Sequence, residues 1–118
     1  MADSALFIGF GAPVRGRERQ AMQVFGEATE YYSRLQKEGE IESFEPVLLE
    51  PHGGELGGFF LVHGDQDKLA RVRGSAEFER QFMRAELIVD NLGVTGAAVG
   101  ERLMSQMSVF AEQVEDLS

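Results

Sequence analysis

The apolar positions of the chain fall into short unbroken runs and longer stretches with helical spacing. The short runs are Leu6–Phe10, Ile41–Leu49, Gly58–His63 and Val94–Val99, and a glycine or proline follows each within two residues. Runs of this length with such boundaries are typical of β-strands. Pro46 lies inside the second run, and proline lacks an amide hydrogen, so this run is predicted to lie at a sheet edge or to carry a bulge.

Between these runs, apolar residues recur at spacings of three and four, which indicates helices with one apolar face. The first helix is predicted over about residues 17–37, a short one over 66–72, and a longer one over Ala76–Asn91. Gly74 separates the latter two, and Ser75 is suited to be the N-cap of the longer helix. A last helix is predicted over about 101–116.

The resulting order is β-α-β-β-α-β followed by a helix, which is the split βαβ pattern. The sequence therefore predicts an α+β, ferredoxin-like fold, with an antiparallel sheet, helices on one face and a C-terminal helix. We expect one domain over 1–118, with its core at about 5–100 and no internal linker.

The strands are apolar on both faces, as in LFIGF and GFFLV. An antiparallel sheet with one wet face should instead alternate apolar and polar residues. The helices can cover only one face, so a second copy of the chain is expected to cover the other. A two-fold homodimer packed sheet against sheet would form a dimeric α/β barrel.

The last predicted helix carries apolar residues in a 4-3-4-3 spacing, which suits packing along a seam. These residues are Leu103, Met107, Phe110, Val114 and Leu117. The stripe is predicted to dock either on its own barrel or on that of the partner.

Composition and charge limit the classes of function. The chain has 118 residues, no cysteine and a net charge of −9. A disulfide scaffold, a zinc-thiolate site and a cysteine nucleophile are thereby excluded. The acidic charge disfavours nucleic acid as a partner, since binding to it needs a cationic surface. The one basic cluster is interrupted by Glu18 and is typical of a solvated helical turn; it consists of Arg15, Arg17 and Arg19.

No apolar window approaches the ~20 residues of a membrane helix. Asp3 stands where a signal peptide would carry positive charge. We therefore expect no membrane association and a cytoplasmic location.

The element order, the doubly apolar strands and two phrases of sequence resemble the dimeric α/β-barrel superfamily. The phrases are EGEIESFEPVL, leading into the second strand, and GGFFLVHGDQDKLARV, leading into the second helical region. The second is similar to YCII-type, EthD-like and antibiotic-monooxygenase-like proteins. The resemblance implies homodimers with a pocket, and enzymes that often need no metal or organic cofactor, so no cofactor is expected. YCII-type proteins carry a histidine on the first helix, whereas this chain has GEATEYYSRL there, so no catalytic residue is transferred.

The chain has two histidines, of which His52 lies in the loop before the predicted third strand and His63 at the far end of that strand. Seven strand residues span ~20 Å, so one chain cannot place both on one metal ion, and no metal site is predicted. The glycines of HGGELGG indicate a turn. His63 shares a strand face with Phe59 and Leu61 and could serve as an acid or base near neutral pH.

The candidate catalytic residues are thus His63, with Tyr31 or Tyr32 orienting a substrate. The candidate ligand-binding residues are Phe7, Phe44, Phe59 and Phe60. Two further patterns do not indicate a functional site. GFGAPVRG lacks the third glycine of a dinucleotide-binding loop, and Glu86 with Asp90 indicates a solvated helix face.

The sequence is compatible with two functions. One is a small cofactor-independent enzyme that acts on a hydrophobic molecule in the barrel by isomerisation, oxygenation or decarboxylation. In that case His63→Ala should abolish the activity. The alternative is a non-catalytic homodimer that binds a ligand or a protein.

Overall fold

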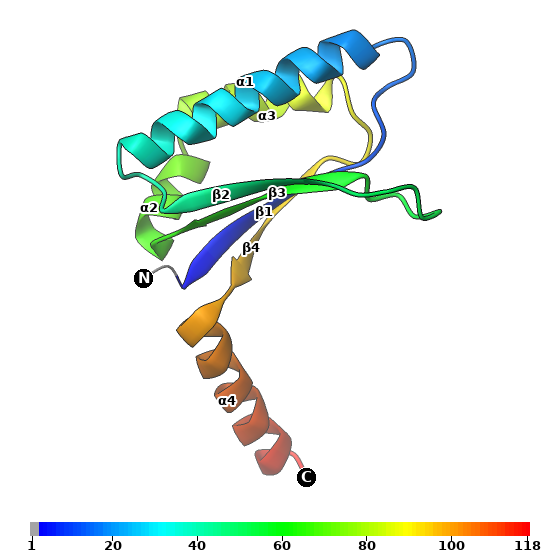
Figure 1. Cartoon of the computed structure of the whole chain (residues 1–118). Coiled ribbons are helices and arrows are strands. Elements are labelled where there is room, and N and C mark those ends of the chain that lie inside the picture. Colours follow the sequence, from blue (N-terminus) through cyan, green and yellow to red (C-terminus); the bar gives the residue numbers. More distant parts are fainter. Residues whose placement is uncertain (1–2) are drawn as a thin grey trace.

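The computed structural model describes residues 3–118, which form a four-stranded antiparallel sheet with helices on one face (Figure 1). The sheet order is β2-β3-β1-β4, so the first strand of the chain lies inside the sheet. The strands are β1 (Ser4–Phe10), β2 (Ser43–Leu48), β3 (Gly58–Gly64) and β4 (Gly93–Ala98). The helices are α1 (Glu18–Lys37), α2 (Gln66–Arg73), α3 (Ala76–Glu86) and α4 (Gly100–Asp116).

This arrangement confirms the α+β, ferredoxin-like βαββαβ fold that the sequence predicts. Helices α1, α2 and α3 lie on one side of the sheet, and α4 extends from the other (Figure 1). β2 is an edge strand beside β3, which confirms the position predicted from Pro46. β1 begins at Ser4, two residues before the predicted start, because Ser4 pairs with Gly64 of β3 and Ala98 of β4.

Alternation along β3 separates two different faces of the sheet. Phe60 and Val62 face the helices and are 4% and 0% exposed. They pack in a core cluster with side chains of β1, α1, α2 and α3. Its other buried members are Leu6, Ile8, Tyr31, Tyr32, Leu35, Ile41, Leu69, Val72 and Phe78.

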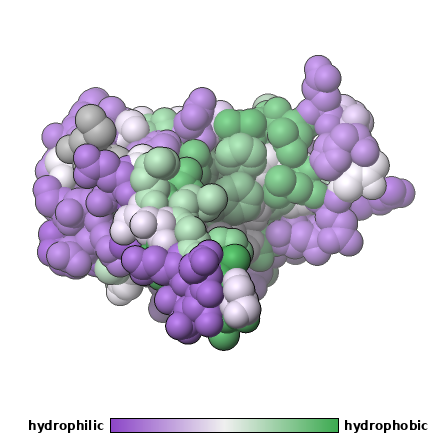
Figure 2. Space-filling model, turned by 90° about the horizontal axis from the view of Figure 1, so that it is seen from below, coloured by the Kyte–Doolittle hydropathy of each residue, from purple (hydrophilic) through white to green (hydrophobic). Residues whose placement is uncertain are grey.

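The opposite face of the sheet, here named the open face, carries the other half of each strand. Its members include Phe7, Phe59, Leu61 and His63, which are half-buried. Figure 2 views the molecule from this side and shows hydrophobic side chains gathered across the middle, framed by hydrophilic ones. None of the four helices within residues 3–118 lies flat over this face (Figure 1).

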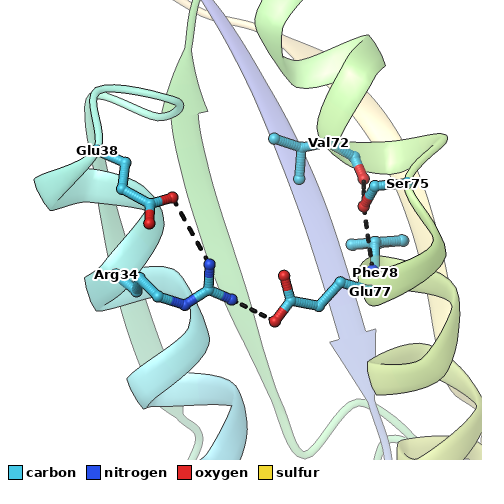
Figure 3. A network of polar contacts seen from close by, with 6 residues as sticks. All are labelled: Arg34, Glu38, Val72, Ser75, Glu77 and Phe78. Atoms are coloured by element: carbon cyan, nitrogen blue, oxygen red, sulfur yellow. Dashed lines mark hydrogen bonds and ion pairs between the residues drawn. The ribbon is translucent and has the colours of Figure 1, made fainter.

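Side-chain caps begin α2 and α3. The Asp65 carboxylate accepts a hydrogen bond from the Lys68 amide (3.2 Å) at the start of α2. The Ser75 hydroxyl accepts from the Phe78 amide (3.1 Å) and donates to the Val72 carbonyl (2.7 Å). Ser75 therefore caps α3, as predicted, while it holds the end of α2 beside it (Figure 3).

The prediction that the longer helix runs to Asn91 is wrong, because α3 ends at Glu86. Residues 88–90 form a short backbone ladder with residues 11–14, in which Pro13 and Val89 are bridge partners. The ladder includes the hydrogen bonds Gly11 N to Asp90 O (2.7 Å), Val14 N to Ile88 O (2.8 Å) and Asp90 N to Ala12 O (2.9 Å). Glu86 and Asp90 consequently share no helix face.

Two ion pairs join α1 to α3 across the top of the molecule. Arg34 contacts Glu77 and, at 3.6 Å, Glu38 (Figure 3). Arg84 donates two hydrogen bonds to the Glu27 carboxylate, at 2.9 and 3.0 Å, which lowers the pKa of Glu27. Such exposed pairs stabilise by ~0–1 kcal/mol each, so their main effect is to set the spacing of the two helices.

α4 projects away from the sheet on the side of the open face (Figure 1). It has no buried residue. Its first turn is held by a hydrogen bond from Arg102 to the Gln66 side chain (2.6 Å). Within residues 3–118, no helix has the length and apolar character needed to cross a membrane.

Candidate functional site

A cavity of about 600 Å³ lies between the helix-facing side of the sheet and the helices α1 and α3. This volume is in the range of small-molecule sites. Its lining is mainly apolar and comes from β1, β2, β3, α1, α3 and the loops that join them. Central lining residues are Ile8, Phe10, Phe25, Ala28, Tyr32, Phe60, Phe78, Gln81, Phe82 and Ala85.

The walls of the cavity are built from aromatic side chains that contact one another. Phe60 lies 5.1 Å from Phe25 and 5.5 Å from Tyr32 between ring centroids. On the α3 side, the rings of Phe78 and Phe82 lie 6.1 Å apart with nearly parallel planes. Rings held by several neighbours in this way keep a fixed shape, so the cavity is suited to a ligand of defined outline.

Small residues on α1 and α3 leave room for the cavity between the aromatic rings. Ala21 and Ala28 of α1 and Ala85 of α3 line the cavity, where larger side chains would fill it. Helical spacing already places these alanines on the apolar faces in the sequence.

One polar atom in the lining has no partner. The side-chain oxygen of Gln81 is buried and accepts no hydrogen bond from residues 3–118. Gln81 lies on α3 between Phe78 and Phe82 and contributes to the cavity wall. A buried acceptor left unpaired costs ~1–3 kcal/mol, so a ligand or water that donates a hydrogen bond here would be stabilised.

Exposed apolar side chains mark the rim of the cavity. Met22 of α1 is 78% exposed, Leu48 of β2 is 69% exposed, and Leu49 is partly exposed, yet all three line the cavity. Glu18 is the charged group in the lining. Access from solvent is therefore between the start of α1 and the end of β2.

Backbone also borders the cavity at this same end of the sheet, where Phe10 and Leu48 both pair with Gly58. Gly11 lies where β1, the loop before β3 and the segment after α3 converge. A Cβ atom on Gly11 would come within 2.9 Å of the carbonyl oxygens of Asp90 and Glu55, so this crossing requires glycine. The Gly57 amide donates to the Phe10 carbonyl at 2.8 Å and fixes the same crossing.

Both candidate tyrosines are buried, but only Tyr32 lines the cavity. Burial raises the pKa of the Tyr32 hydroxyl, and the neighbouring Tyr31 raises it further. The Tyr31 ring lies under the Arg34 guanidinium, 5.5 Å from its centroid. Burial also raises the pKa of Tyr31, while a hydrogen bond with Ser75 acts in the opposite direction. Tyr32 therefore stays neutral at physiological pH and can donate a hydrogen bond there.

These shifts predict an alkaline unfolding transition. In the unfolded chain the tyrosines ionise near their ordinary pKa of 10.0. Above that pH the unfolded chain loses protons that the folded chain retains, so stability that is complete below pH ~10 falls as the pH rises. The chain has two tyrosines and no tryptophan, so tyrosinate absorbance should rise together with loss of helical circular dichroism. Tyrosine ionisation near pH ~10 with the helical signal unchanged would contradict this expectation.

His63 and Tyr32 lie on opposite faces of the sheet. His63 pairs with Ala5 and Ser43, and its side chain belongs to the open face, whereas Tyr32 packs over the helix-facing side. The structure therefore does not bring the predicted acid or base and the predicted orienting tyrosines into one site within a protomer. The catalytic role of His63 stays a prediction for the open face.

The four candidate phenylalanines are also divided between the two faces of the sheet. Phe7 and Phe59 contact each other on the open face, with ring centroids 5.0 Å apart. Phe60 lines the cavity, and Phe44 packs beside it on the same face at 6.5 Å without lining the cavity.

His52 is a part of the turn between β2 and β3. Its Nδ1 accepts a hydrogen bond from the Gly54 amide (3.2 Å), and its Nε2 lies 2.8 Å from the Leu56 carbonyl oxygen. The neutral tautomer with a proton on Nε2 satisfies both contacts. In residues 3–118, no three His, Asp or Glu side chains cluster as they would around a metal ion.

Comparison with known proteins identifies the fold but not the function. No protein-family model matches the chain, and no curated protein matches its sequence. A dimeric protein of unknown function with a ferredoxin-like fold from Bacteroides fragilis is similar in structure, with a TM-score of 0.59 and 10% identity. That likeness covers 81% of this chain and 96% of the other.

A second solved structure is similar to the same degree. It is SnoaB, a cofactor-independent oxygenase from Streptomyces nogalater, with a TM-score of 0.54 and 14% identity. The likeness covers 84% of this chain and 95% of SnoaB. At these identities the two structures establish the ferredoxin-like fold alone. The finer resemblance to YCII-type proteins stays a prediction.

Proposed function

We propose that the protein is a homodimer that binds a small, mainly apolar molecule in the helix-side cavity of each protomer. The observation that carries the proposal is the cavity of about 600 Å³ with its aromatic walls. Burying an apolar ligand there removes its surface from water, which stabilises the complex by ~25 cal/mol per Å². The partner for the ligand's polar group is the unpaired Gln81 oxygen, which selects an O–H or N–H donor.

The homodimer is supported by the apolar open face (Figure 2). Facing sheets would bury Phe7, Phe59 and Leu61 of both protomers. The Bacteroides fragilis protein of the same fold is dimeric. A cytoplasmic location without a nucleic-acid partner stays a prediction from composition.

Catalysis without a cofactor in the same cavity is a second candidate function. Tyr32 favours it, because a neutral phenol in a mainly apolar cavity can hold a hydrogen bond to a reacting oxygen. SnoaB, which shares the fold, is a cofactor-independent oxygenase. In this case the bound molecule would be changed on exposure to air, whereas a binding protein would return it unaltered.

Native mass spectrometry of the purified protein tests the proposal directly. We expect a dimer that carries a small additional mass, which is released under denaturing conditions. Protein freed of that mass should bind 1-naphthol, a neutral bicyclic phenol whose hydroxyl can donate to Gln81. A bare protein that also fails to bind 1-naphthol would contradict the cavity as a binding site.

The separation of His63 from the cavity gives a second test. We expect His63→Ala to change the affinity for 1-naphthol by less than about twofold, because the two lie on opposite faces of the sheet and share no contact. Isothermal titration calorimetry measures both proteins under the same conditions. A loss of binding in this variant would place the ligand between the two sheets instead.

A further inference from the structure

α4 is an amphipathic helix whose apolar side is exposed in its own protomer. The apolar residues form one stripe, here named the α4 stripe, with exposures between 45% and 83%. Its members are Leu103, Met107, Phe110, Val114 and Leu117. Glu101 and Glu112 lie on the opposite side of the helix, by helical spacing. A contiguous apolar stripe of this length indicates an interaction surface.

The protomer offers the α4 stripe no surface of its own. α4 starts immediately after β4, whose last residue Ala98 pairs with Ser4 at the start of β1. From there it runs away from the sheet and from the other helices (Figure 1). α4 therefore needs a surface on another molecule.

The exposed rim of the cavity lies at the diagonally opposite corner of the sheet. α4 leaves the edge strand β4 at the end where β1 begins. Leu48 ends the other edge strand, β2, near the end of β1. Met22, Leu48 and Leu49 make this corner apolar as well as exposed. A protomer thus carries an unpaired apolar helix at one corner and an unpaired apolar rim at the other.

Charges at the two corners are complementary. The C-terminal end of α4 carries Glu115 and Asp116, and no basic residue lies in its last turn. Acidic groups at this end of a helix repel its negative dipole end, so they are stabilised by external cations. Arg17 and Arg19 lie at the start of α1, beside Met22, and neither takes part in an ion pair among residues 3–118.

A two-fold axis brings these corners together. Consider two sheets that face each other with their strands at nearly right angles. A two-fold axis along the diagonal that joins the other two corners then places each β4 corner over the β2 corner of the other protomer. The 17 residues of α4 span ~25 Å at 1.5 Å each. Facing sheets are ~10 Å apart, so α4 is long enough to pass the partner's sheet edge and reach its helix layer.

We propose that α4 docks on a second copy of this chain, with the α4 stripe on the Met22, Leu48 and Leu49 rim. The acidic end of α4 then lies beside the arginines at the start of the partner's α1. Each cavity is completed by the other protomer, which covers its entrance. The inference rests on the homodimer proposed above and assigns the part of that dimer that closes the binding site.

Cysteine cross-linking tests the docking, because the natural chain has no cysteine. Met22→Cys protein with a size tag is mixed with untagged Val114→Cys protein, allowed to exchange subunits, and oxidised. We expect a disulfide-linked species that contains one chain of each kind. Glu112→Cys is the matched control, since it lies on the same helix but faces away from the stripe. Its yield with Met22→Cys should be at least about tenfold lower, because helical residues two apart point to different sides.

Equal yields from Val114→Cys and Glu112→Cys, or no linked species, would overturn the docking. If native mass spectrometry still finds a dimer that binds 1-naphthol, the proposed function stands without it. A monomer would overturn the docking together with the homodimer. Thermal unfolding of each single variant confirms that the chains are folded before they are mixed.

Charge reversal is an independent test of the same contact. Arg17→Glu with Arg19→Glu in one chain, or Glu115→Arg with Asp116→Arg, should weaken dimer association. The four changes combined should restore it, because the ion pairs re-form with opposite signs. Weakening that persists in the combined variant would overturn the proposed contact between these charges.

Discussion

Phe60→Ala is expected to lower the free energy of unfolding by about 3–5 kcal/mol, which is a large part of the stability of a domain of this size. Phe60 is buried at the centre of the helix-facing side of the sheet. Its ring contacts Phe10 and Phe25 as well as Tyr32. Because these neighbours also line the cavity, their collapse into the vacated space should abolish ligand binding. Chemical denaturation monitored by circular dichroism measures the loss.

The adjacent residue provides the matched control. Phe59 has the same side chain on the same strand, but it points to the open face and is only half-buried. Phe59→Ala should destabilise the separate protomer by less than Phe60→Ala. Its effect should depend on protein concentration, because the open face is buried in the proposed dimer. Equal, concentration-independent losses in the two variants would contradict the assignment of the two faces.

Ala28→Phe is expected to weaken binding of 1-naphthol at least about 100-fold, equivalent to ~2.7 kcal/mol. Ala28 lies on α1 in the wall of the cavity, and a phenyl ring there would occupy the space reserved for the ligand. The fold should be retained, because the added ring enters an existing cavity rather than a packed core. Calorimetric titration and thermal unfolding measure the two quantities separately.

Ala70→Phe is the control for this experiment. Ala70 lies on α2, is exposed, and does not line the cavity. The affinity of the Ala70→Phe variant for 1-naphthol should remain within about twofold of that of the natural protein, because the site lies elsewhere. Retained binding in Ala28→Phe would show that the ligand occupies a different site.

The strands and their succession along the chain could be predicted from the sequence, because apolar runs and glycine boundaries report local geometry. The end of α3 could not be predicted in this way. Leu87, Ile88 and Val89 continue the apolar pattern of the helix, but the backbone of residues 88–90 pairs with residues 11–14, far away in the sequence. A contact between distant segments leaves no periodic signal in either of them.

The candidate site was predicted in part. Tyr32 and Phe60 were predicted near a ligand, and both line the cavity. Phe59 and Phe60 were grouped in one pocket, although neighbouring residues of a strand must point to opposite faces. The same alternation separates His63 from Phe60. Gln81 was overlooked, yet a polar residue three positions after Phe78 and four before Ala85 falls on the apolar side of α3 and could have been singled out.

The backbone ladder between residues 11–14 and 88–90 has a consequence for protein engineering. Main-chain hydrogen bonds hold this border of the cavity, so its geometry depends little on which side chains stand there. Ala12 and Val89 line the cavity from this ladder. Both positions can be randomised to reshape the ligand pocket while the frame around it persists. The fold is thereby a starting point for directed evolution of new binding specificities.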